Sequence, residues 1–141
     1  MFRAVVDTSV VVAALRSQLG ASNAMLRLIA WGRIVPLATP ALFLEYEEVL
    51  KRPEQSAVHG LDNGKVDRFL ASLASAIEPV TVHIGWRPQL RDPADEMVLE
   101  AAINGRADAL VTFNVKDFLP TAKRFGLSVL RPADVLEKVK P

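Results

Sequence analysis

Acidic side chains stand at four separate places in this sequence, each beside a run that predicts a strand or a helix. They are Asp7, Glu45, the pair Asp92 and Asp95, and Asp117 with Asn114 shortly before it. In an open α/β sheet, ligands bind beyond the carboxyl ends of the strands, and each of these segments can reach that edge. We therefore expect the carboxylates to form one cluster, although they are far apart in the sequence.

A cluster of carboxylates without histidine or cysteine offers only oxygen ligands. Such a site suits Mg²⁺ or Mn²⁺ better than Zn²⁺. Because neighbouring carboxylates repel one another, the cluster is tolerable mainly when a cation neutralises it. A metal ion held in this way lowers the pKa of a bound water and offsets charge on a leaving oxygen. The chemistry that the sequence predicts is therefore hydrolysis of a phosphodiester.

Each acid also has an interpretation that needs no ligand. Asp7 could simply end a strand in a turn, but its place between a buried apolar run and a Thr-Ser pair favours a functional role. Asp92 precedes Pro93, which favours a helix N-cap, and Asp95 would then be an acid in the first helical turn that the helix dipole favours. For Asp95 the motif alone leaves both interpretations open.

The predicted helix of residues 41–51 carries three glutamates, Glu45, Glu47 and Glu48. On a helical wheel Glu48 points away from the apolar face, whereas Glu45 and Glu47 flank that face on opposite sides. Periodicity therefore excludes Glu48 and leaves the other two open.

The elements that would position these acids alternate along the chain. Apolar runs rich in branched side chains predict strands at residues 4–6, 34–38, 79–84, 109–112 and 129–130. Apolar residues at helical spacing predict helices at residues 21–31, 41–51, 65–76, 94–104 and 133–138, and favour a helix for residues 10–15. Residues 55–64 look least structured, and residues 85–93 look like a loop. This alternation indicates an α/β domain with a mostly parallel sheet.

The composition is that of one domain, which we expect to span residues 1–141. Hydrophobic residues make up 50% of the chain, enough for a core, and the absence of cysteine excludes disulfides and thiol nucleophiles. We see no signal peptide and no membrane span, so we expect a cytoplasmic protein. The net charge of +1 argues against a mainly electrostatic nucleic-acid binder. A haloacid-dehalogenase-type phosphatase is disfavoured, because Ser9 stands where that chemistry requires a second aspartate.

Four motifs in order resemble those of the PIN domain, and more narrowly the VapC-like toxins of toxin–antitoxin pairs. They are Val-Val-Asp-Thr-Ser-Val at residues 5–10, Thr-Pro leading to Leu-Glu-Tyr-Glu-Glu-Val-Leu at residues 39–50, Arg-Asp-Pro-Ala-Asp-Glu-Met-Val-Leu-Glu-Ala-Ala at residues 91–102, and Leu-Val-Thr-Phe-Asn-Val-Lys-Asp-Phe at residues 110–118. Each motif is weak alone, but four in this order over nearly the whole chain are strong. The resemblance selects Glu45 over Glu47 and Asp95 over Asp92.

The resemblance implies a three-layer α/β/α sandwich and Mg²⁺- or Mn²⁺-dependent cleavage of RNA that leaves a 5′-phosphate. It implies a catalytic and metal-binding set with two supporting residues: Asp7, Glu45, Asp95 and Asp117, supported by Ser9 and Asn114. Many members of the family have an aspartate where Asn114 stands, so Asp117 could be the fourth acid, and one ion or two could bind. The same departure leaves a second function open, a catalytically silent PIN-like module that binds partners or RNA.

The resemblance also implies two protein partners, a second copy of the chain and a small antitoxin that blocks the site. Both would need exposed apolar surface. The early helices offer Leu15, Leu19, Met25 and Leu28 for this purpose, although the default interpretation of such a stripe is core.

Overall fold

The computed structural model describes residues 1–83, 90 and 92–139. In that part of the chain, five parallel strands form one sheet in the order β3-β2-β1-β4-β5. The strands are β1 (Phe2–Val6), β2 (Ile34–Ala38), β3 (Glu78–Pro79), β4 (Ala109–Val111) and β5 (Ser128–Leu130). The helices are α1 (Thr8–Arg16), α2 (Ala21–Ala30), α3 (Pro40–Leu50), α4 (Pro53–His59), α5 (Asn63–Ala76), α6 (Pro93–Asn104), α7 (Val115–Arg124) and α8 (Pro132–Lys138).

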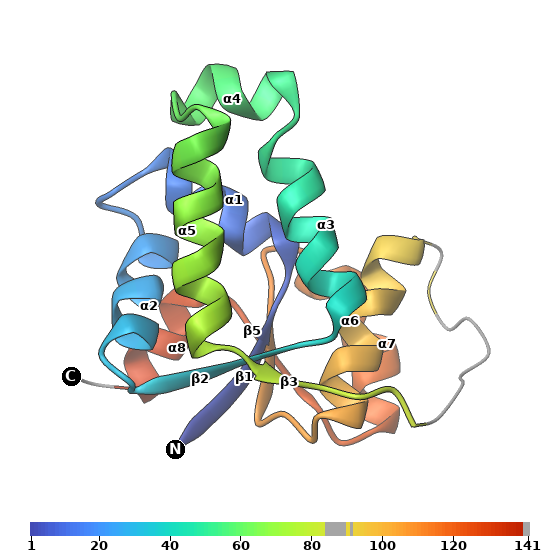
Figure 1. Cartoon of the computed structure of the whole chain (residues 1–141). Coiled ribbons are helices and arrows are strands. Elements are labelled where there is room, and N and C mark those ends of the chain that lie inside the picture. Colours follow the sequence, from blue (N-terminus) through green and yellow to red (C-terminus); the bar gives the residue numbers. More distant parts are fainter. Residues whose placement is uncertain (84–89, 91, 140–141) are drawn as a thin grey trace.

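Helices cover both faces of the sheet. α6 and α7 pack on one side, and α1, α2, α5 and α8 lie on the other (Figure 1). α3 contacts α1 and also α6, so it connects the two helical layers. The molecule is a three-layer α/β/α sandwich, which confirms the predicted fold class. None of the helices in the described ranges is long and apolar enough to cross a membrane.

The strand order reverses at β1. From β1 the chain passes to β2 and β3 on one side, and it returns to β4 and β5 on the other. β1 and β4 are neighbours, with Val6 paired to Val111 at their carboxyl ends. Such a reversal is where open α/β sheets bind their ligands. Asp7 and Thr112 directly follow the two paired residues.

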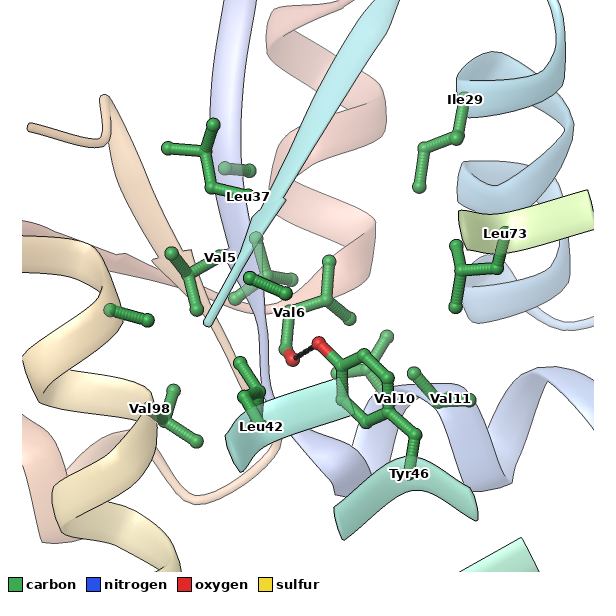
Figure 2. Close-up of a cluster of buried hydrophobic side chains, with 14 of the residues drawn as sticks. Val5, Val6, Val10, Val11, Ile29, Leu37, Leu42, Tyr46, Leu73 and Val98 are labelled. Atoms are coloured by element: carbon green, nitrogen blue, oxygen red, sulfur yellow. Dashed lines mark hydrogen bonds between the residues drawn. The ribbon is translucent and has the colours of Figure 1, made fainter. Parts of the chain in front are cut away.

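The core beside this edge fastens α3 to β1. Figure 2 shows the Tyr46 ring of α3 among buried apolar side chains that include Val10 and Leu42. The Tyr46 hydroxyl donates a hydrogen bond to the backbone carbonyl of Val6 (Figure 2). Burial, and then the charge of Asp7, raise the pKa of Tyr46 far above its ordinary value, so the hydroxyl stays a donor. The helix that carries Glu45 is thereby anchored at the end of β1.

Two local predictions at β2 and α3 are confirmed. The strand predicted at residues 34–38 is β2. The Thr39-Pro40 signal marks the start of α3, where the Thr39 hydroxyl oxygen accepts a hydrogen bond from the Leu42 N–H (3.1 Å). The capping hydroxyl and the fixed φ of proline act within one turn, so this signal is local.

The prediction for residues 55–64 was wrong, because this segment contains most of α4 and the start of α5. The missed signals are Pro53 at the first position of α4 and Gly60 at its end. Gly60 has a φ of 69°, the left-handed conformation that commonly ends a helix.

Two further segments differ from expectation. Of the strand expected at residues 79–84, only Pro79 lies in a strand, at the end of β3. Residues 80–83 form no strand, and residue 84 lies outside the described residues. The loop expected at residues 85–93 also lies mostly outside them. After β4 the chain forms α7, which was not predicted. α7 buries Phe118 and Ala122 although Pro120 lies inside it.

Candidate functional site

Asp7 is buried at the end of β1, with 6% of its surface exposed. Its carboxylate Oδ2 accepts hydrogen bonds from the hydroxyls of Ser9 (2.8 Å) and Thr112 (2.7 Å). It precedes α1 but makes no side-chain capping hydrogen bond to that helix. Two neighbouring segments therefore fix one oxygen of this carboxylate.

Thr112 was not singled out from the sequence, although it connects Asp7 with the segment that begins at Asn114. It is fully buried directly after β4. Its hydroxyl donates to Asp7 and accepts a hydrogen bond from the N–H of Asn114 (3.0 Å). The one signal in the sequence is a hydroxyl residue at the end of a buried strand. Its partner Asp7 is 105 residues away, so local patterns could not reveal the pairing.

We expect Thr112→Val to lower the free energy of unfolding by about 1–3 kcal/mol, because it removes a donor to a buried carboxylate. Asp7 would also lose a contact that orients it, so affinity for Mn²⁺ should fall by roughly tenfold to a hundredfold. Thr112→Ser keeps the hydroxyl and is the matched control. Urea unfolding and calorimetric Mn²⁺ titration measure the two effects. Equal behaviour of the valine and serine variants would contradict this role.

Asp92 and Asp95 stand at the start of α6 in different surroundings. Asp92 is exposed, and its Oδ1 accepts a hydrogen bond from the Ala94 N–H (2.9 Å), which confirms the predicted N-cap. Asp95 is half-buried. Burial, and then the charges of Asp7, Asp92 and Asp117, raise the pKa of Asp95 to about 6. Carboxylates from three segments of the chain therefore lie close enough for their charges to act on Asp95.

The surroundings of the α3 glutamates distinguish Glu45 from Glu47. Burial, and then the negative charges of Glu48, Asp92 and Asp7, raise the pKa of Glu45, and nearby Arg52 opposes this rise. Glu45 thus lies close enough to Asp92 and Asp7 to be affected by their charges.

Glu47 is engaged elsewhere. Its carboxylate pairs with the ammonium of Lys51 (3.1 Å), which also pairs with Asp67 of α5 (2.6 Å). Glu47 therefore belongs to an ion-pair network between α3 and α5, on the other side of α3.

Asn114 and Asp117 lie at the start of α7, and both are exposed. Asn114 occupies the N-cap position without a side-chain capping hydrogen bond. Asp117 lies in the first turn, close enough to Asp95 to raise its pKa. A cleft with a volume of about 570 Å³ lies here, lined by Asp92 and Asp95 of α6 and by Lys116 and Asp117 of α7.

Asp7 follows β1, Asn114 and Asp117 come after β4, and the charges of Asp7 and Asp92 act on Glu45 and on Asp95. These acids do not form a tight group, since within residues 1–83, 90 and 92–139 no three His, Cys, Asp or Glu side chains are placed to hold a metal ion. The donors that face one another are all oxygens. This donor set, in which burial and neighbouring acids raise the pKa of Glu45 and Asp95, fits a hard divalent cation.

Comparison with known proteins gives the family. A family model described as PIN domain matches residues 3–116. This span contains α3, α6, β4 and all of β1 except Phe2, and it ends at Lys116. No curated protein matches the chain. The matched span is most of the 141 residues. The chain therefore belongs to the PIN domain family, whose members are generally nucleases.

Proposed function

We propose that this protein is a metal-dependent endoribonuclease that hydrolyses RNA phosphodiester bonds. The observation that carries the proposal is the cleft that Asp92, Asp95 and Asp117 line, where burial, and then the charges of Asp7, Asp92 and Asp117, raise the pKa of Asp95 to about 6. Repulsion of this kind costs stability unless a cation or a proton relieves it. The family membership supports a nuclease, and the all-oxygen donor set supports Mg²⁺ or Mn²⁺ as the ion.

The residues proposed to hold the metal are Asp7, Glu45, Asp95 and Asp117, supported by Ser9 and Asn114. When bound, the ion would lower the pKa of a water and offset charge on the leaving oxygen. Asp7 contributes a carboxylate that is already oriented, since Ser9 and Thr112 hold its Oδ2. Asp95 loses its proton near neutral pH, so its carboxylate is available as a ligand in that range.

A cleavage assay tests this function. The purified chain should cut a labelled RNA in Mg²⁺ and leave 5′-phosphate ends, and it should be inactive with excess chelator. Activity that persists in chelator would contradict a metal-dependent reaction. If RNA binds but is not cut under any condition, the protein is better described as a catalytically silent PIN-like module. That alternative arises because Asn114 stands where many members of the family have an aspartate.

The resemblance to VapC-like toxins supports a role as the toxin of a toxin–antitoxin pair, acting on RNA in the cytoplasm as a homodimer. Of the apolar residues suggested for a partner surface, Met25 and Leu28 are core residues, with 0% and 3% of their surfaces exposed. Leu19 is 98% exposed and remains a candidate. Light scattering tests the dimer, and a strictly monomeric species at micromolar concentration would count against it. The antitoxin role is tested with the small protein identified as the neighbouring antitoxin. If this protein, added in excess, leaves RNA cleavage unchanged, the proposed toxin–antitoxin pair is contradicted.

A further inference from the structure

Lys116 is a basic side chain in a cleft otherwise marked by acids. It lies at the second position of α7 and is exposed, and it lines the cleft together with Asp92, Asp95 and Asp117. No salt bridge within 4.0 Å joins Lys116 to an acid in the described part of the chain. Its ammonium is therefore available to a ligand in the cleft.

Within the described residues, a second basic side chain, Arg52, lies close enough to act on Glu45, and it already pairs with Glu48 (3.1 Å). Among the described residues that line the cleft, carboxylates outnumber basic groups, so they would repel a phosphate that entered it without a cation. Lys116 is the basic group that the described cleft residues offer to such a phosphate.

The position of Lys116 in its helix does not explain its presence. A cation in the first turn of a helix faces the positive end of the helix dipole, which is unfavourable. Its neighbour Asp117, in the same turn, is the charge that a helix start prefers. The helix dipole therefore gives α7 no stability from Lys116.

We propose that Lys116 binds a backbone phosphate of the RNA strand and holds it across the cleft beside Asp95. The proposal rests on the proposed function and names a substrate contact for it. An ammonium is a compact point charge, and a phosphate carries no sequence information, so this contact gives affinity and not specificity. RNA and single-stranded DNA should therefore lose the same contact when Lys116 is replaced.

The test compares Lys116→Met with Lys123→Met, which removes the same charge from an exposed position in the last turn of the same helix. Both changes are made in an Asp95→Asn background, where cleavage is expected to be absent. Binding of a short fluorescent single-stranded RNA is followed by anisotropy at several salt concentrations. Lys116→Met should weaken binding about fivefold, the upper end for one exposed ion pair. It should reduce the slope of log affinity against log salt by about 0.7, the value for one phosphate of a single strand.

In the otherwise wild-type chain, loss of ground-state binding should raise KM and leave kcat within about twofold. Lys116→Arg keeps the charge and should retain most of the affinity, and thermal unfolding of Lys116→Met should match the wild type or exceed it. Identical affinities and salt slopes for the Lys116→Met and Lys123→Met variants would overturn the proposal, and so would an absence of RNA binding. If binding depends on Lys116 while no form of the chain cleaves RNA, the phosphate contact stands and the proposed function fails.

Discussion

Replacing Asp7 with asparagine is expected to lower the affinity for Mn²⁺ by at least about a hundredfold. This loss exceeds the roughly tenfold to hundredfold loss of affinity that follows when a residue that only orients a metal ligand is replaced. The same change should abolish RNA cleavage. Asp7 is the buried acid of the site, and the hydroxyls of Ser9 and Thr112 already orient it. Asparagine has the same shape but no charge, so the fold should survive. Calorimetric titration with Mn²⁺ and a cleavage assay on the same preparation measure both losses.

Asp62→Asn is the matched control. Asp62 caps α5 by accepting a hydrogen bond from the Lys65 N–H (2.8 Å), and it lies at an exposed helix start that contributes nothing to the cleft. Asparagine caps helices about as well as aspartate, so this variant should keep its stability, its metal affinity and its activity. Unchanged Mn²⁺ affinity in Asp7→Asn would exclude Asp7 as a ligand.

Replacing Asp95 with asparagine is expected to stabilise the metal-free protein at pH 8 while it abolishes cleavage. The folded-state pKa of Asp95 is about 6, above the ordinary value of 3.8. The folded state therefore binds this proton more tightly than the unfolded state does. The stability that the proton contributes is complete below about pH 4 and is lost as the pH rises through about 6. Asparagine does not ionise and avoids this loss.

The rise in the pKa of Asp95 from 3.8 to about 6 would correspond to nearly 3 kcal/mol, but Asp95 is only half-buried, and solvent screening reduces the expected gain to about 1 kcal/mol. Urea unfolding of both proteins in chelator should show this gain at pH 8 and none at pH 4. Excess Mn²⁺ should stabilise the wild type and leave Asp95→Asn unchanged. A variant that is less stable than the wild type at pH 8 would contradict the repulsion at Asp95.

Asp92 provides the contrast on the same turn. Asp92→Ala should cost about 1 kcal/mol, because the Ala94 N–H loses its cap, and Asp92→Asn should cost almost nothing. Both variants should still cleave RNA. If Asp92→Asn abolishes cleavage while Asp95→Asn leaves it intact, the assignment of roles within the Asp-Pro-Ala-Asp motif is wrong.

The sequence by itself determined features that depend on neighbours along the chain. The run of branched residues at 34–38 predicts β2, and the Thr39-Pro40 cap marks the start of α3. Asp92 before Pro93 likewise identifies the start of α6. These signals act within one turn or one strand, so no distant contact is needed to interpret them. The alternation of such elements was enough to predict a parallel α/β sheet.

Tertiary structure decided which polar groups meet, because that depends on strand order and packing. Periodicity could not choose between Glu45 and Glu47, although family resemblance selected Glu45. In the structure Glu47 pairs with Lys51, which also pairs with Asp67. The charges of Asp92 and Asp7 act on Glu45 instead. Thr112 meets Asp7 only because β4 lies beside β1. α7 forms although its sequence contains a proline, since burial of its apolar side chains outweighs the weak local propensity.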